Sequence, residues 1–221
     1  YLVKKNTVVA TRYNIKRGIA ELGPAGFLFE QYVEIVMRSM GYKTRRNVIM
    51  RGRCVPHEID VLAKNENEHV IIEAKYHNES GIKTAVDVVM YAYARLEDIT
   101  IAQKIKEETH VPHIMWLFTN TRFSGHAIKY AKCMGIRLTG WNYPRENSLE
   151  KIVNDYALYP VTALTSVDRF SREIFAKQNM MLAQDIAPYS VFDLVKKFGL
   201  DQKRAERIAR EAQALVYGDT Q

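Results

Sequence analysis

Two apolar segments on either side of a short polar run constrain the fold of this chain most strongly. Residues 57–63 and 69–76 are rich in Val, Ile and Ala, and residues 64–68 between them read Lys-Asn-Glu-Asn-Glu. Apolar segments of strand length that flank a polar turn are typical of a β-hairpin. We therefore predict that these two segments pair as antiparallel strands.

The predicted hairpin brings ionisable side chains together at one end. A turn centred between Glu66 and Asn67 pairs residues whose numbers sum to 133, which places Asp60 opposite Glu73. Lys75 lies two positions beyond Glu73, so both side chains leave the same face of the strand. Carboxylates can hold a divalent cation, and a lysine can orient or deprotonate water or stabilise a transition state. The pattern is typical of metal-dependent phosphodiester hydrolysis.

A purely structural alternative explains the same charges. Lys75 could form a strand-borne ion pair with Glu73 or Glu58 that has no catalytic role, and Asp…Glu-x-Lys strings also arise by chance. Directly opposed carboxylates repel each other. If Asp60 and Glu73 serve a metal, their replacement by Ala should abolish metal binding and cleavage. Without metal, it should leave stability unchanged or improve it.

The rest of the chain alternates helical and strand patterns. An amphipathic helix is expected between Pro24 and Gly41, and Ser124 and Gly135 have the residue types that begin and end a helix. We predict strands at 43–50, 113–119 and 136–141, a helix from about 81 to 97 that extends less clearly to 108, and helices after 142, with start signals at 147–150 and 165–168. This order predicts an α/β fold, a mixed β-sheet flanked by helices, with a mainly helical C-terminal extension.

Composition adds limits rather than a function. The chain is 47% hydrophobic and 26% charged, and it has neither a membrane-spanning apolar run nor a signal-peptide pattern. Its net charge of +7 suits a polyanionic partner without proving one. Cys54 and Cys133 lack metal-ligand spacing, so we expect buried, reduced thiols. Basic residues near Gly199 could contact phosphates, although a solvated charged face also explains them.

The segments around the hairpin resemble a known family. Its similarity extends over roughly residues 23–143 and rests on Gly26-Phe27-Leu28-Phe29-Glu30, Val33, Met40-Gly41-Tyr42, His57-Glu58-Ile59-Asp60-Val61, Ile72-Glu73-Ala74-Lys75-Tyr76, Leu117 to Phe123, Ala127, Ala131 and Gly135 to Gly140. These segments resemble the Mrr-type restriction endonucleases of the PD-(D/E)xK superfamily. The resemblance implies a restriction-endonuclease-like fold and a DNA endonuclease, of the restriction or DNA-processing type.

The resemblance also assigns roles to individual residues. It makes Asp60 and Glu73 ligands of Mg²⁺ or Mn²⁺, places Ala74 in the same metal site and makes Lys75 the catalytic lysine. Glu30, on the first predicted helix, becomes an auxiliary acid that reaches the metal through water. Many Mrr-type proteins carry Gln where Glu73 stands, but Glu is the better Mg²⁺ ligand.

Double-stranded DNA is the expected partner. Tyr76 and His77 continue the catalytic strand and could line the DNA cleft, and Arg51 and Arg53 near the hairpin could contact phosphates. DNA affinity should then fall steeply with salt. We expect a cytoplasmic protein with no membrane partner, for which a homodimer is compatible with the sequence.

Residues 12–17 resemble the end of an ATP-cone domain that precedes the nuclease in one branch of the family. We accordingly divide the chain into 1–22, the remnant of an ATP cone or a linker helix, 23–143, the nuclease domain, and 144–221, the helical extension. ATP would act only through the missing N-terminal domain. Two alternatives stay open: a nuclease-like module that binds nucleic acid or senses nucleotides without cleaving, and a regulatory oligomerising domain whose acids form a salt-bridge network.

Overall fold

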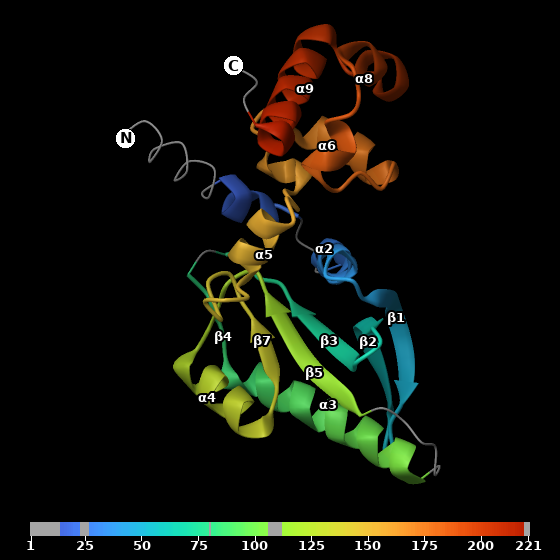
Figure 1. The fold of residues 1–221 in the computed structure, drawn as a ribbon, viewed down its shortest axis with the longest axis vertical. Helices are drawn as coiled ribbons and strands as arrows, with labels where there is room; N and C mark the ends of the chain where they lie inside the picture. Colours follow the sequence, from blue (N-terminus) through green and yellow to red (C-terminus); the bar gives the residue numbers. More distant parts are fainter. Residues whose placement is uncertain (1–13, 23–26, 80, 106–111, 219–221) are drawn as a thin grey trace. The chain divides into compact units, whose positions relative to one another are not determined.

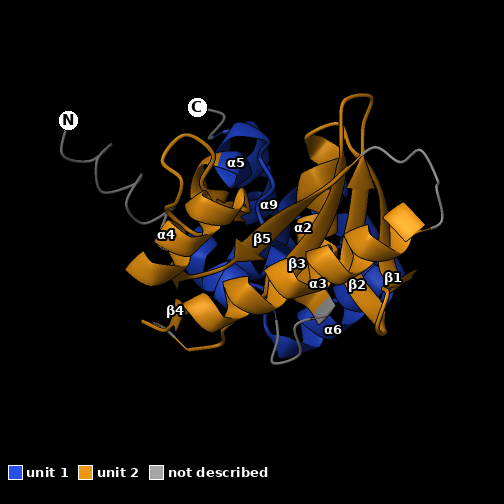
Figure 2. Cartoon of the chain, turned by 90° about the horizontal axis from the view of Figure 1, so that it is seen from below, with its two compact units in different colours: residues 1–22, 152–221 blue, residues 23–151 orange. Residues whose placement is uncertain are grey.

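The computed structural model of this protein describes residues 14–22, 27–79, 81–105 and 112–218. The chain folds as two compact units (Figure 2). One, the sheet unit, comprises residues 23–151, and the other, the helical unit, comprises residues 1–22 and 152–221. Arg12 and Tyr13 of the run that resembles an ATP cone lie outside the described residues.

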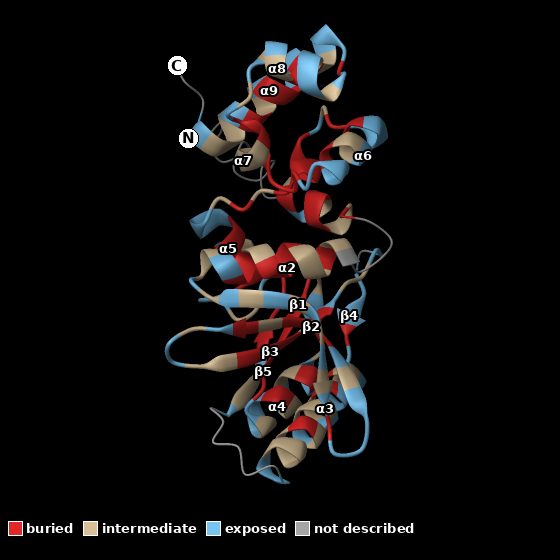
Figure 3. Cartoon of the chain, turned by 90° about the vertical axis from the view of Figure 1, so that its right-hand side faces the viewer, coloured by how far each residue is buried: buried red, intermediate tan, exposed pale blue. Residues whose placement is uncertain are grey.

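A five-stranded mixed sheet forms the centre of the sheet unit, with the strand order β1-β2-β3-β5-β7 (Figure 1). The pairs β1–β2 and β2–β3 are antiparallel, whereas β3–β5 and β5–β7 are parallel. Helix α2 covers one face, and α3 and α4 cover the other (Figure 3). The elements are α2 (Phe27–Ser39), β1 (Lys43–Arg51), β2 (Pro56–Lys64), β3 (His69–Lys75), β4 (Lys83–Thr84), α3 (Val86–Ile105), β5 (His113–Thr119), β6 (Arg122–Phe123), α4 (Gly125–Met134) and β7 (Arg137–Thr139). Helix α5 (Leu149–Asp155) begins in the sheet unit and continues into the helical unit from Ile152 on. This architecture confirms the predicted fold class.

Local signals explain where several elements begin and end. The Ser124 side chain accepts a hydrogen bond from the backbone N–H of Ala127, and Gly135 ends α4 in the left-handed conformation, as predicted. Helix α5 begins within the predicted start signal at 147–150, where the Ser148 side chain accepts from the backbone N–H of Lys151. The short parallel pair β4–β6 was not predicted. Two-residue strands are too short to show a hydrophobic period.

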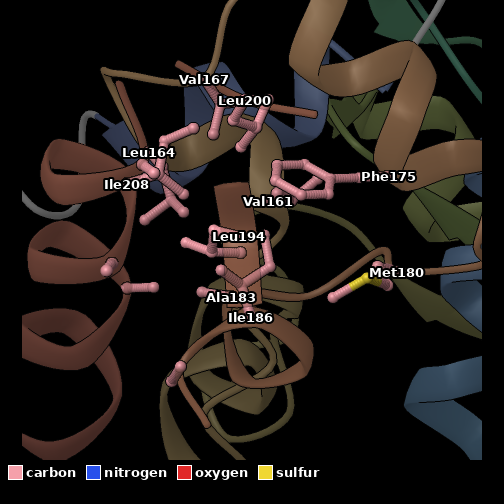
Figure 4. Close-up of a cluster of buried hydrophobic side chains, with 14 residues drawn as sticks. Val161, Leu164, Val167, Phe175, Met180, Ala183, Ile186, Leu194, Leu200 and Ile208 are labelled. Carbon is pink, nitrogen blue, oxygen red and sulfur yellow. The ribbon is translucent and has the colours of Figure 1, made fainter. Parts of the chain in front are cut away.

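The helical unit is built around one apolar core (Figure 4). Its elements are η1 (Val161–Ala163), α6 (Arg169–Lys177), α7 (Ala183–Ile186), α8 (Val191–Phe198) and α9 (Gln202–Tyr217), and residues 14–20 are also helical. Asp168, the last residue of the predicted start signal at 165–168, caps α6 by accepting from the backbone N–H of Ser171. These elements confirm a mainly helical C-terminal region.

Residues 14–22 pack within the helical unit. Ile15, Ile19 and Leu22 are buried, and the Thr162 hydroxyl donates to the Gly18 carbonyl over 2.6 Å. A Cβ atom on Gly18 would lie 2.7 Å from the backbone nitrogen of Ala163, so only glycine permits this close approach. The assignment of this segment to an ATP-cone remnant stays a prediction.

Two further observations concern composition. Across the described ranges, no helix combines the length and the apolar character required to traverse a lipid bilayer. Cys54 and Cys133 are both exposed free thiols, so the expectation that they are buried was wrong. Cys54 lies in the β1–β2 turn, and Cys133 lies near the end of α4 on its exposed side, whereas Ala131 of the same helix faces the core.

Candidate active site

The β2–β3 hairpin has the register that the turn sequence predicts. Val61 pairs with Ile72, and the remaining pairs continue to Lys64 with His69, so the numbers of each pair sum to 133. The ladder ends before Asp60 and Glu73, which would be the next pair. The candidate active site therefore lies where β2 separates from β3.

Strand β1 is distorted opposite the same point. Arg46 pairs with Val61 and Val48 pairs with Ile59, but Asn47, which would face Asp60, is absent from the ladder and has a φ of 52°. The register is the same on both sides, so no residue is inserted. A left-handed residue within a strand rotates the chain that follows it.

Because of this rotation, side chains of β1 that would share one face of the sheet in a regular strand lie on opposite faces. Arg46 hydrogen-bonds Glu34 of α2, whereas Met50 packs into the core formed with α3 and α4. These two residues are four positions apart and would share a face in a regular strand. On β2, Ile59 likewise joins the core beneath α3 and α4. Asp60 sits at the transition, and its Oδ2 accepts a hydrogen bond of 2.8 Å from the backbone N–H of Ala74.

Arg95 of α3 also joins the site, a contact that no sequence pattern predicted. Its Nη1 donates to Glu73 Oε2 at 2.5 Å and to the Glu58 carbonyl at 3.1 Å. The side chains of Arg95 and Glu73 are only 11% and 17% exposed, so the ion pair is largely screened from water. The Arg95 guanidinium also lies over the ring of Tyr91, 4.9 Å from its centre. Glu73 is therefore held from α3, and not by Lys75.

Burial and mutual repulsion disfavour the ionised acids. Burial raises the pKa of Glu73 to about 7, with the Asp60 carboxylate adding to the rise and Arg95 and Lys75 opposing it. Burial also raises the pKa of Asp60, against the stabilising hydrogen bond from Ala74. The pKa of Glu30 on α2 is raised by burial and then by Asp60 and Glu58, while Arg46 lowers it. Glu30 thus lies within the electrostatic field of the same acidic group.

Lys75 has the freedom that a catalytic amine requires. It is the exposed last residue of β3. No acidic side chain in the described part of the chain forms an ion pair with it, so the Glu58–Lys75 pairing considered from the sequence is not observed. Its positive charge nevertheless reaches both Asp60 and Glu73, whose pKa values it lowers.

The donor set fits a hard divalent cation in chemistry but is not gathered into a complete ligand cage. Within the described residues, no group of three or more His, Cys, Asp or Glu side chains is arranged to hold a metal ion. Asp60 and Glu73 each commit one carboxylate oxygen to a protein donor. Their other oxygens, Oδ1 and Oε1, make no hydrogen bond to any described residue. Carboxylate oxygens are the ligands that Mg²⁺ prefers, and this cation usually keeps several waters.

The residues expected to contact DNA occupy different settings. The ring of Tyr76 packs 5.9 Å from that of Phe29. His77 is fixed by Asn120, whose side chain accepts from its N–H and donates to its carbonyl, and its ring bonds Thr84 at 3.0 Å. Burial, followed by the charge of Lys75, lowers the pKa of His77. The chain after β3 is therefore anchored to the loop after β5.

Arg51 and Arg53 are exposed at the tip of the β1–β2 hairpin. Asp98 of α3 holds this tip, since its carboxylate accepts from the backbone N–H of Cys54 at 2.9 Å and bonds the His57 ring at 2.8 Å. These bonds lower the pKa of Asp98 to about 2. His57 thus has a structural role at this tip, as a partner of Asp98.

Comparisons with known proteins identify relatives but no activity. Residues 159–216 match a family described as AF1548-like, C-terminal. An uncharacterized protein of Archaeoglobus fulgidus is 34% identical over 181 residues, which cover 82% of this chain and 98% of that protein. The crystal structure of AF1548, a protein of unknown function, is 34% identical and has a TM-score of 0.67. The alignment covers 88% of this chain and 99% of that one.

Proposed function

The chain belongs to the AF1548-like family, and because the names of its relatives assign no activity, we propose from the site itself that it is a metal-dependent endonuclease. Its substrate is double-stranded DNA and its place of action the cytoplasm. The observation that carries the proposal is the burial of two acids side by side at the break in the β2–β3 ladder. Burial, followed by repulsion from the Asp60 carboxylate, raises the pKa of Glu73 to about 7, a condition that a bound cation relieves.

Each residue has a role in this proposal. Asp60 and Glu73 hold Mg²⁺ or Mn²⁺, with Ala74 at the same site, and Glu30 holds a water molecule near them. Lys75 orients the attacking water or stabilises the phosphorane-like charge, since its amine is exposed and has no acidic partner in the described residues. The divalent cation supplies positive charge against the charge that develops on the phosphate. The resemblance to Mrr-type endonucleases supports the same assignment.

A nucleic-acid-binding or nucleotide-sensing module without cleavage is the second candidate. The ion pair between Arg95 and Glu73 favours it, because Arg95 neutralises Glu73 in the absence of metal. An acid that is already paired has less need of a cation. A direct assay for cleavage separates the two candidates.

Supercoiled and linear DNA should be incubated with the full chain and Mg²⁺ or Mn²⁺, with EDTA as the metal-free reaction. We expect nicking or linearisation that requires metal and is lost in Asp60→Ala and Lys75→Ala. Glu66→Ala is the matched control, because Glu66 is an exposed acid in the β2–β3 turn, away from the break in the ladder. Absence of cleavage under all these conditions, or equal activity in Asp60→Ala, would overturn the proposal.

A further inference from the structure

Helices α8 and α9 are joined by a short turn whose two ends are fixed. Gly199 ends α8 in the left-handed conformation (φ 66°, ψ 24°), and its N–H donates to the Val195 carbonyl. Asp201 begins α9 by accepting from the backbone N–H of Arg204. Gly199, Leu200 and Asp201 alone separate the helices, which is the turn length of a helix-turn-helix motif, where a glycine is common.

The inward side chains lock the two helices together. Leu194 of α8, Leu200 of the turn, and Ala205 and Ile208 of α9 are all at most 2% exposed and belong to one core (Figure 4). Phe198, the last residue of α8, packs against the same core. Apolar side chains thus stand on both sides of the turn and fix the crossing of α8 over α9. A rigid pair of this kind presents the outer face of α9 in a fixed direction.

That outer face carries a basic stripe. Lys203, Arg207 and Arg210 are exposed and follow the spacing i, i+4, i+7, so they lie within about 60° of one another around the helix. They stand opposite the buried residues Ala205 and Ile208. No acid in the described part of the chain pairs with any of the three, whereas Arg204 is engaged by Asp168 and Asp201. The stripe is therefore available to a polyanion.

We propose that α8 and α9 form a helix-turn-helix that binds duplex DNA, with α9 as the helix that enters the major groove. Lys203, near the N-terminus of α9, faces the base edges, and Arg207 and Arg210 contact the phosphates beside the groove. Lys196 and Lys197, exposed on α8, contact the DNA backbone that α8 crosses. The B-DNA major groove admits a helix, whereas that of A-form RNA is too narrow. The helical unit is thus a second DNA-binding surface, independent of cleavage.

The test measures binding of the full chain to a mixed-sequence DNA duplex by fluorescence anisotropy in EDTA. The variant Lys203→Gln/Arg207→Gln/Arg210→Gln removes the stripe. The control Lys104→Gln/Lys129→Gln/Lys132→Gln removes the same charge from exposed positions on α3 and α4. Each phosphate contact contributes about 0.9 to the slope of log affinity against log salt, so loss of the two phosphate contacts of Arg207 and Arg210 should lower the slope by about 1.8. The control should leave the slope close to that of the wild type.

Further variants and measurements distinguish loss of the basic stripe from misfolding and from general loss of charge. The variant Lys203→Arg/Arg207→Lys/Arg210→Lys keeps the charges and should retain the salt slope, and thermal melting should show that all variants stay folded. Equal losses in the stripe and control variants, or equal competition by duplex RNA, would overturn the proposal. DNA binding that depends on the stripe in a protein that cleaves nothing would refute the endonuclease alone. Cleavage combined with a stripe variant of unchanged affinity would refute the helix-turn-helix alone.

Discussion

The raised pKa of Glu73 makes the stability of the sheet unit depend on pH, and Glu73→Gln should remove that dependence. The pKa of this carboxyl is about 7 in the folded chain, against an ordinary value of 4.5. Between these values the folded state holds a proton that the unfolded state has released, so the free energy of unfolding falls as pH rises. A tenfold change in proton affinity corresponds to about 1.4 kcal/mol, so the full loss is about 3 kcal/mol.

Urea denaturation in EDTA, repeated from about pH 4 to pH 8, measures this effect. Trp116 and Trp141 both belong to the sheet unit, so their fluorescence reports on that unit. The wild type should lose about 3 kcal/mol relative to Glu73→Gln across the window. Glu68→Gln is the control of opposite sign, because Arg137 lowers the pKa of Glu68 and that acid stabilises the fold as pH rises. Parallel pH profiles for the wild type and Glu73→Gln would refute the reasoning.

Three further predictions use the same fluorescence assay or the cleavage assay. Mg²⁺ should raise the free energy of unfolding of the wild type by about 2.7 kcal/mol at one hundred times its dissociation constant, and Asp60→Asn should abolish the effect; equal stabilisation of both would contradict a metal site at Asp60. Lys75→Ala should keep the Mg²⁺ stabilisation but lose cleavage by about 10²-fold or more, so concurrent loss of metal binding would show that Lys75 builds the site. A Cβ on Gly52 would lie 2.0 Å from Asp98 Oδ2, so Gly52→Ala should destabilise by about 1–3 kcal/mol, whereas Gly125→Ala, with nothing within 4 Å of its Cβ, should not.

Sequence patterns predicted the sheet unit well because its elements are separated by strong local signals. The strand at His113–Thr119 has the predicted bounds, and the β2–β3 register follows from the polar turn that joins the strands. Signals of this kind depend on neighbours in the chain, so one sequence is enough to read them. The β4–β6 pair lacked such a signal, since Thr84 and Phe123 meet only because the surrounding fold brings them together.

The candidate site was only partly predictable for the same reason. The sequence placed Asp60, Glu73 and Lys75 on one hairpin, but it did not show that Asn47 adopts a left-handed conformation where β2 leaves β3. Nor could it show that Arg95 reaches Glu73, since that contact depends on how α3 packs against the sheet. In a long helix of mixed polar and apolar composition, the neighbouring residues do not indicate which side chain an arginine contacts.

Arg95 also changes the expected effect of truncating the acids. Repulsion alone predicts that Asp60→Ala or Glu73→Ala leaves metal-free stability unchanged or improves it. The structure adds a donor to each acid: Ala74 N–H to Asp60 and the 11%-exposed Arg95 to Glu73. Truncation leaves the Ala74 N–H without an acceptor and leaves Arg95 with only the Glu58 carbonyl. Loss of an acceptor costs about 1–3 kcal/mol for a buried polar group.

We therefore expect Glu73→Ala to be less stable than Glu73→Gln in EDTA at pH 8 by about 1–3 kcal/mol, because both variants remove the charge and only Gln keeps an acceptor for Arg95. Glu73→Gln keeps an oxygen for Arg95 and should be at least as stable as the wild type at that pH. The difference between Gln and the wild type at position 73 measures the effect of the charge, and the difference between Gln and Ala measures the effect of the oxygen that accepts from Arg95. If Glu73→Ala and Glu73→Gln had equal free energies of unfolding in urea denaturation, Arg95 would not require an acceptor at position 73. An interaction other than the Arg95–Glu73 ion pair would then hold Asp60 and Glu73 together against their mutual repulsion.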